Sequence, residues 1–336
     1  MTRFIHTSDW QLGMTLHFLS PESQARYSQA RIDAVADLGR VSIEQKCEFV
    51  VVSGDVFETN RVSRQVVARA CEAMAAILIP VLLLPGNHDP LDSGSVYSSE
   101  VFLDRCPDNV RVLTGAQVER PVDGVEVLGA PWRSKRPLED LLAMAAADLA
   151  PDPAAVRILV GHGVVDVLNP ARDNPSQISL AGLEASLTAR GVDYVALGDR
   201  HSTTSVGTTG RVWYSGTPEV TDFDEVDPGN ILVVELTGPT PEARHGTAHV
   251  EPVKVGYWRF LRQRFELTDD TVSDLESWLS ALPDKQRSVA KVSLVGALTL
   301  GGFAVIEQTL DKYSDLLAGL ERWARHTELV VLPDSG

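Results

Sequence analysis

Five short polar stretches, each just after an apolar run typical of a buried strand, constrain the fold of this chain more than any other feature. They are Ser8-Asp9-Trp10-Gln11, Gly54-Asp55-Val56-Phe57-Glu58, Gly86-Asn87-His88-Asp89, Gly161-His162-Gly163 and Gly198-Asp199-Arg200-His201. An α/β sheet brings distant parts of a chain together at the carboxyl ends of its strands, where such folds build their sites. The pattern therefore predicts one α/β site assembled from several loops.

Apolar, β-branched runs alternate with helical patterns over the first two-thirds of the chain, as expected for strands buried on both faces. The predicted strands are residues 4–5, 49–52, 81–84, 156–160 and 194–197. The sequence Ser20-Pro21-Glu22 predicts a helix start with Pro at the first helical position, and that helix should reach about Gln45. Further helices are predicted over residues 63–76, 137–147 and 180–190.

The pattern changes after His201. Strand-like segments at 212–214, 231–236 and 248–255 predict antiparallel strands that complete a second sheet, with 239–246 as a linker or a hairpin loop. From Tyr257 the pattern is strand 258–267, helix 273–281, strand 290–298, helix 302–325 and strand 328–332. We therefore expect a main domain at 1–255 and a small α+β cap at 256–336.

Composition limits the classes of protein that fit. Lys and Arg number 30 against 46 Asp and Glu, and the resulting formal charge of −16 opposes attraction to nucleic-acid phosphates. Cys47, Cys71 and Cys106 are widely spaced, which fits a reducing compartment and not a disulfide framework. The most apolar stretch, 75–84, is too short and interrupted for a membrane span, and the N-terminus lacks a secretory signal. A cytoplasmic protein with no membrane partner is the expectation.

The polar stretches hold the side chains that divalent metals prefer. Carboxylate and amide oxygens suit Mn²⁺ or Mg²⁺, and imidazole extends the range toward iron and Zn²⁺. Taken singly, Asp55 and Asn87 could be turn formers and His162 a core histidine. Taken together, they favour a metal site. The candidate ligands are Asp9, Asp55, Asn87, His162, Asp199 and His201.

The series of motifs resembles the calcineurin-like metallophosphoesterase superfamily and, more narrowly, the SbcD family of DNA-repair nuclease subunits. The likeness covers about the first 235 residues, and the cap only in general layout. It implies an α/β fold: a two-sheet metallophosphoesterase sandwich flanked by helices, with a small C-terminal α+β cap. The stretches that carry the narrower likeness are Thr7-Ser8-Asp9-Trp10-Gln11-Leu12-Gly13, Ser53-Gly54-Asp55-Val56-Phe57, Pro85-Gly86-Asn87-His88-Asp89 and Tyr214-Ser215-Gly216-Thr217-Pro218.

The resemblance assigns roles to the metal ligands. It implies two divalent ions, Mn²⁺ or alternatively Mg²⁺, bridged by Asp55 at a separation of ~3.5–4 Å. Asp9 and His201, with Gln11 beside them, would bind the first ion. The second ion would be bound by Asn87, His162 and Asp199.

The resemblance also implies roles in catalysis. His88 would face the scissile phosphate and protonate the leaving oxygen, with Asp89 orienting its ring; the alternative for His88 is a loop-capping histidine. Arg61, Arg64 and Trp132 are candidate substrate-binding residues, the arginines for phosphates and the tryptophan for base stacking. A solvated surface is the alternative for both arginines.

Two positions depart from the family pattern. Gln11 stands where the family has His, and a neutral amide oxygen binds transition metals more weakly than imidazole does. Asp199 replaces the first His of Gly-His-x-His, and its charge favours a hard cation. Glu58, in place of the usual Asp, is one methylene longer and is expected to lie outside the ligand set.

The activity implied is hydrolysis of DNA phosphodiesters, as an exonuclease or endonuclease, by a water activated between two metals, without a covalent intermediate. The implied partners are DNA, a coiled-coil ATPase of the SbcC type and a second copy of the chain. The helix at 302–325 could pack on its own sheet or offer a partner groove. A small-molecule (nucleotide) phosphodiesterase, which suits the acidic surface better, and a weakly catalytic scaffold of a repair complex remain alternatives.

Overall fold

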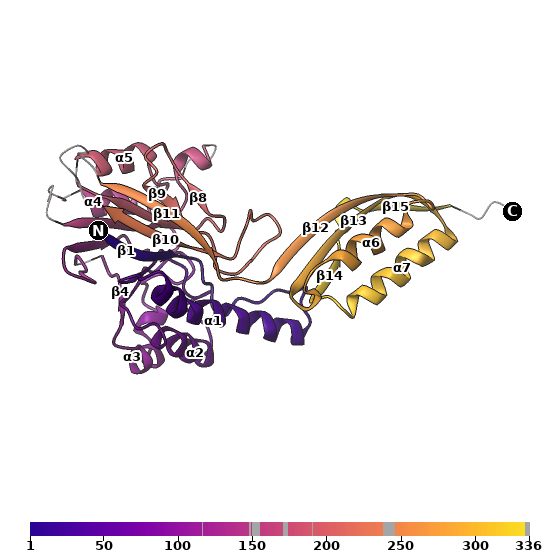
Figure 1. Cartoon of the computed structure of the whole chain (residues 1–336), viewed down its shortest axis with the longest axis horizontal. Coiled ribbons are helices and arrows are strands. Elements are labelled where there is room, and N and C mark those ends of the chain that lie inside the picture. Colours follow the sequence, from indigo (N-terminus) through magenta and orange to yellow (C-terminus); the bar gives the residue numbers. More distant parts are fainter. Residues whose placement is uncertain are drawn as a thin grey trace. The chain divides into compact units, whose positions relative to one another are not determined.

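The computed structural model of the chain describes residues 1–115, 117–147, 149, 155–170, 174–189, 191–237 and 246–332. The chain forms two compact units, which are coloured along the sequence in Figure 1. The first unit comprises Met1–Met14, Ala30–Glu219 and Glu225–Gly256, and the second comprises Thr15–Gln29, Val220–Asp224 and the chain from Tyr257 onward. The chain therefore passes between the units several times.

A six-stranded sheet forms the centre of the first unit. Its strands β1 to β4 run parallel, while β10 pairs antiparallel with β1 and β11 pairs antiparallel with β10. Val50, Val51 and Val52 of β2 are fully buried, as expected for a central strand covered on both faces. In spatial order the strands are β11 (Thr247–Lys254), β10 (Asn230–Thr237), β1 (Thr2–Thr7), β2 (Val50–Val52), β3 (Val81–Leu83) and β4 (Val110–Val112).

A second, five-stranded sheet packs against the first. Strands β5, β6, β7 and β9 are parallel, and the short β8 closes the edge antiparallel to β9. In spatial order they are β5 (Val125–Gly129), β6 (Val156–His162), β7 (Tyr194–Gly198), β9 (Val212–Tyr214) and β8 (Thr204–Ser205).

The two sheets share one apolar core. Phe4 of β1 stacks on Phe49 with ring centroids 5.0 Å apart and meets Tyr194 of β7 edge-on at 5.6 Å. Val51 and Ile158, from opposite sheets, belong to the same buried cluster. This contact between inner faces makes the unit a two-sheet sandwich.

Helices cover the outer faces of the sandwich. Apolar residues of α1 (Pro21–Glu44), α2 (Arg64–Ala75) and α3 (Glu100–Arg105) pack on the first sheet. The second sheet is covered by α4 (Leu141–Ala146) and α5 (Leu180–Ala189). The predicted α/β sandwich flanked by helices is therefore confirmed.

The second unit contains a small parallel sheet with helices on one face (Figure 1). Strand β13 (Ser288–Thr299) pairs with β12 (Arg259–Leu267), β14 (Gly319–Arg322) and β15 (Glu328–Leu332), all in parallel. Helices α6 (Val272–Ala281) and α7 (Leu300–Ser314) pack their apolar sides against this sheet. The expected small α+β element is present.

Two details of the predicted layout are wrong. Strands β10 and β11 extend the first sheet and not the second, because β10 pairs with β1 along its length. The helix expected at 302–325 is α7, which ends at Ser314, and residues after it form β14. Its apolar spacing continued past the helix end because Leu320 of β14 contacts the same cluster as Ile306 of α7.

The other expected helices and strands are present, apart from differences at their ends. Strand β9, expected to be antiparallel, is antiparallel to β8 but parallel to β7. The short helix α3 and strands β4 and β5 were not anticipated. Residues 239–245 of the expected linker or hairpin, and the expected helix end at Arg190, lie outside the described residues. Among the described residues, no helix is long and apolar enough to cross a membrane.

The stacked pair at the centre of the sandwich gives a stability prediction. Phe4→Ala should destabilise the first unit by about 3–5 kcal/mol, because truncation leaves a cavity between the sheets. Phe4→Leu should cost less than half as much, since it keeps most of the apolar volume. Urea denaturation followed by circular dichroism measures both, and equal midpoints for wild type and Phe4→Ala would contradict the expectation.

Candidate metal centre

The predicted ligands lie at the carboxyl ends of strands from both sheets. Asp9 and Asp55 follow β1 and β2 of the first sheet, and His162 is the last residue of β6 in the second sheet. Asn87 follows β3, and Asp199 comes directly after β7. Parallel strands share one carboxyl edge, so segments far apart in the sequence meet at this end of the sandwich.

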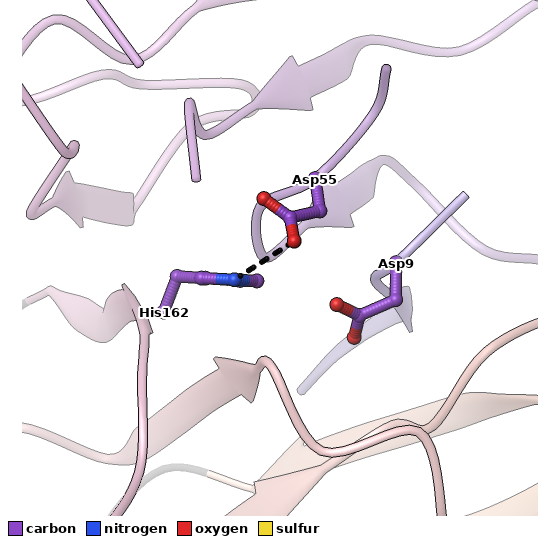
Figure 2. A group of neighbouring side chains, drawn as sticks. All are labelled: Asp9, Asp55 and His162. Carbon is purple, nitrogen blue, oxygen red and sulfur yellow. Dashed lines mark ion pairs between the residues drawn. The ribbon is translucent and has the colours of Figure 1, made fainter. Parts of the chain in front are cut away.

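Asp9, Asp55 and His162 form the buried centre of the site. One ligand atom from each lies within 4.8 Å of the others, and Figure 2 shows the imidazole of His162 directed at the Asp55 carboxylate. His162 Nε2 is 3.3 Å from Asp55 Oδ2. All three residues are at most 4% exposed. Two carboxylates buried this close to an imidazole form a group that can hold a metal ion.

The remaining candidate ligands surround this centre. Asn87 Oδ1 is 2.7 Å from His162 Nε2, and Asp199 Oδ1 is 3.8 Å from the same nitrogen. On the other side, His201 Nε2 lies 3.8 Å from Asp9 Oδ1 and 3.4 Å from Gln11 Nε2. The structure thus brings all seven predicted ligands into one group.

The donor set fits divalent cations. It combines carboxylate and amide oxygens, which Mn²⁺ and Mg²⁺ prefer, with two imidazoles, which extend the range toward iron and Zn²⁺. Among the described residues, the buried side-chain oxygen Gln11 Oε1 has no hydrogen-bond partner, although burying an unpaired polar oxygen is unfavourable. A cation beside Gln11 would satisfy that oxygen.

Backbone strain is concentrated at the same residues. Four of the candidate ligands have positive φ angles, in the left-handed region that residues other than glycine rarely adopt. They are Asp9 (53°), Gln11 (42°), Asp55 (55°) and Asp199 (93°). Such conformations cost roughly 1–3 kcal/mol each and persist where the surrounding structure enforces them. The strain turns these side chains toward a common centre.

Two glycines let the loops approach closely enough to form the site. A Cβ at Gly54 would lie 2.1 Å from His162 Nδ1, and one at Gly86 would lie 2.2 Å from Asp55 Oδ1. Gly54 also has a φ of +99°. Any side chain at either position would displace the residues that make the centre.

Opposite charges around the histidines alter their protonation. Burial alone would lower the pKa of His162, but Asp55, which also accepts its hydrogen bond, together with Asp9 and Asp199, raises that pKa well above its ordinary value. Burial would likewise lower the pKa of His201, yet its hydrogen bond to Glu225 and the charge of Asp9 raise it to about 9. The nearby carboxylates therefore favour the protonated form of both imidazoles, and these protons offset part of the negative charge of the site.

Sequence reasoning missed residues that support the ligands. Glu225 Oε1 is 3.0 Å from His201 Nδ1, and Ser8 Oγ donates to Asp9 Oδ2 at 2.5 Å. Arg31, only 2% exposed, donates to the backbone carbonyls of Asp9 and Trp10. Ser8 could have been inferred from the motif that contains Asp9. Arg31 lies within a helical pattern and Glu225 within an acidic run, so the sequence gives no sign that either supports a metal ligand.

The catalytic candidates are adjacent to the metal group but are held differently from the expectation. His88 Nε2 lies 4.0 Å from Asp55 Oδ2, and His88 Nδ1 is 2.9 Å from the carbonyl oxygen of Glu58. Asp89 accepts hydrogen bonds from the backbone of Phe57 and Gly86 and from the Tyr97 hydroxyl. The Glu58 carbonyl therefore orients the His88 ring, while Asp89 holds the loops together. Burial and the charge of Asp55 raise the pKa of Asp89 to about 6.

The substrate-binding candidates are divided. Trp132 lies beside the centre, since its Nε1 donates to the carbonyl of His162 at 2.7 Å. Arg61 and Arg64 are exposed, and Arg64 lies 4.0 Å from Glu100 on α3. Within the described part of the chain, neither arginine side chain forms a hydrogen bond or an ion pair with a candidate metal ligand.

The chain matches the family model for calcineurin-like phosphoesterases over residues 2–229. That match covers well over half of its length, so the chain belongs to the calcineurin-like phosphoesterase family. The family binds divalent metals, in agreement with the buried group of Asp9, Asp55 and His162.

Curated relatives match more narrowly. The chain is 31% identical to the SbcD component of the nuclease SbcCD from Rhodobacter capsulatus over 93 residues, which are 26% of this chain and 22% of that protein. It is 26% identical to the DNA double-strand break repair protein Mre11 from Archaeoglobus fulgidus over 208 residues, covering 56% of this chain and 45% of that protein. The chain thus spans less than half the length of either relative.

Solved structures resemble the chain at low sequence identity. A Thermus thermophilus protein superimposes with a TM-score of 0.44 at 11% identity, covering 76% of this chain and 99% of that one. A dimetal phosphatase from Danio rerio gives a TM-score of 0.40 at 12% identity, covering 74% and 98%.

Gln11 offers a direct test of the ligand set. Gln11→His should raise affinity for Mn²⁺ at one site by about tenfold, because imidazole is a stronger ligand than a neutral amide oxygen and histidine tolerates a positive φ. Titration calorimetry measures the gain, and Gln65→His on the exposed side of α2 is the matched control. Equal affinities for wild type and Gln11→His would argue that Gln11 is not a ligand.

Metal binding should also release protons. A metal that binds His162 must displace the proton held there by the raised pKa. Between about pH 6 and about pH 8, each displaced proton should make affinity rise by about tenfold per pH unit. Calorimetry with Mn²⁺ in two buffers of different ionisation enthalpy counts the protons, and identical heats in both buffers would contradict the expectation.

Proposed function

We propose that this protein is a metal-dependent phosphodiesterase that cleaves DNA, acting as a nuclease of the SbcD type in DNA repair. The observation that carries the proposal is the convergence of Asp9, Asp55 and His162 within 4.8 Å of one another, with His88 Nε2 4.0 Å from the Asp55 carboxylate. Hydrolysis of a phosphate ester can use residues that bind metal ions together with a nearby histidine that donates a proton. The candidate ligands and Nε2 of His88 match these two roles.

We assign the ligands beside Asp55 to two sets by their mutual contacts. Asp9, Gln11 and His201, which lie close to one another, would hold a first ion. Asn87, His162 and Asp199 would hold a second, since Asn87 and Asp199 both lie close to His162. Two divalent ions held by these residues, most simply Mn²⁺, would supply an activated water and would neutralise charge on the phosphate oxygens.

The chain itself supplies positioning and proton transfer. Because Nδ1 of His88 faces the Glu58 carbonyl, Nε2 faces the site and is the atom from which a proton would pass to the departing oxygen. The backbone N–H of His88 donates to Asp55 and the Ser8 hydroxyl donates to Asp9, so these two carboxylates are held where they would bind the metal ions. Trp132 packs at the rim through its bond to the His162 carbonyl, where its ring would meet a base.

Similarity to nuclease components favours DNA as the substrate. Two relatives named as the SbcD component of the nuclease SbcCD match over 93 and 100 residues, and a third relative is named as a double-strand break repair protein. By the same likeness we propose a coiled-coil ATPase of the SbcC type and a second copy of the chain as partners. Cys47, Cys71 and Cys106, all free thiols, fit the proposed cytoplasmic location.

A nucleotide phosphodiesterase is the second candidate. The formal charge of −16 gives little attraction for a DNA backbone. A small substrate does not require such a track of positive charge. The same metal chemistry would serve either substrate.

Turnover with added Mn²⁺ tests the reaction. Wild type should hydrolyse bis-para-nitrophenyl phosphate and linear DNA, while His88→Ala should lose about 10²–10⁴-fold, the usual contribution of a general acid. Asp55→Asn should lose at least as much, because a buried carboxylate proposed to bind the metal ions becomes a neutral amide.

Matched controls separate chemistry from folding. His17→Ala and Asp104→Asn remove the same groups at exposed positions and should keep wild-type rates. Equal rates in wild type, His88→Ala and Asp55→Asn would defeat the catalytic assignment. Hydrolysis of nucleotide diesters but not of DNA would favour the second candidate.

A further inference from the structure

A pocket lies wholly within the second unit, apart from the metal centre of the first unit. It has a volume of about 250 Å³. It is lined by Arg262, Gln263, Arg264, Ser293, Trp323 and His326. Two guanidinium groups and two aromatic rings facing one pocket are unusual in a chain with a formal charge of −16.

Strand alternation explains why this side of the sheet is polar. Phe265 and Leu267 of β12, with Val292 and Leu294 of β13, point into the apolar cluster under α6 and α7. Neighbouring residues along a strand point to opposite faces, so the residues between them face away from the helices. Register then places Arg262 beside Lys291 and Arg264 beside Ser293.

The aromatic wall of the pocket is anchored to the sheet. Ser293, only 2% exposed, donates its hydroxyl to the carbonyl of His326. Thr327 Oγ1 accepts from the backbone N–H of Leu294 at 3.3 Å and donates to the Trp323 carbonyl at 3.1 Å. These bonds hold the turn η4 (Ala324–His326) against β13. The pocket is therefore built by buried contacts.

The rings and cations lie close together. The Trp323 and His326 rings are 4.0 Å apart, and Arg262 and Lys291 lie 5.9 and 5.6 Å from the Trp323 ring centre. A cation beside an indole is attracted to its face, and a flat base binds to the same kind of surface.

Carboxylates near these cations are replaceable. Arg262 pairs with Asp224, and Arg264 lies 3.8 Å from Glu266; all four side chains are at least 46% exposed. Lys291 lies 3.2 Å from Glu321. Exposed ion pairs contribute little, whereas a phosphate accepts parallel hydrogen bonds from a guanidinium. A phosphate can therefore take the place of Asp224 or Glu266.

We infer that this pocket binds a nucleoside monophosphate, with the base against Trp323 and His326 and the phosphate on Arg262 and Arg264. Pockets for drug-sized ligands span roughly 300–1,000 Å³, so a pocket of about 250 Å³ holds one nucleotide and not a dinucleotide. The nucleotide is either free or the terminal unit of a strand. This site is separate from the metal centre and does not depend on the function proposed for it.

Calorimetric titration of the full chain with adenosine 5′-monophosphate tests the inference. The monophosphate should bind at least about tenfold more tightly than adenosine or inorganic phosphate alone, since each supplies only half of the contacts. Trp323→Leu and Arg264→Gln should each weaken binding by about tenfold. Arg259→Gln removes the same charge from the same strand outside the pocket lining and should bind as wild type does.

Three outcomes overturn the inference. They are no binding of the monophosphate, equal binding by wild type and both pocket variants, and binding lost in Asp55→Asn but kept in Trp323→Leu. Thermal unfolding checks that each variant folds. If Trp323→Leu does not fold, Arg264→Gln still decides the test, because Arg264 is exposed and its replacement should not disturb folding. If the monophosphate binds, a short 5′-phosphorylated single strand is then added as a competitor. Displacement of the monophosphate identifies a strand end as the natural ligand, and no displacement identifies the free nucleotide.

Discussion

The contact between Asp55 and His162 is the constraint on which the rest of the site depends. Asp55 follows β2 of one sheet and His162 ends β6 of the other, so their 3.3 Å approach joins the two layers of the sandwich at one edge. It also sets an electrostatic problem, because Asp9 and Asp55 bring two buried carboxylates together. Buried charge is tolerated only when it is compensated. Protons on His162 and His201, whose pKa values are raised, would offset part of this charge, and divalent ions would offset it further when bound.

The loops accept local strain to reach this arrangement. Four ligand residues adopt left-handed backbone conformations, and Gly54 and Gly86 leave room that no side chain could share. A sequence selected for stability alone would relieve that strain. Gln11 adds a further cost, since its buried Oε1 has no hydrogen-bond partner in the part of the chain that the structure describes. The unfavourable terms cluster where cations would bind.

Much of the fold and of the ligand group could be predicted because each signal was local. Short apolar runs predicted the central strands, and the polar motifs after them predicted the carboxyl ends of those strands. What failed was non-local: the pairing of β10 with β1 joins residues more than two hundred positions apart, and no local pattern specifies it. Helical spacing could not reveal β14, because Leu320 faces the same core from a strand. Arg31 and Glu225 support the site from segments whose sequences carry no motif.

The small unit is assembled from separated segments, and that has a consequence for its synthesis. Phe18 and Tyr27, near the N-terminus, pack on Phe260, and Phe223 packs on the same ring. On a ribosome, Phe18 and Tyr27 emerge long before Phe260 exists. Domains made of contiguous chain can fold as they emerge, whereas these early aromatic side chains must wait for a late partner. Nascent chains of this protein therefore lack the Phe260 partner of these rings until translation reaches the last quarter of the sequence.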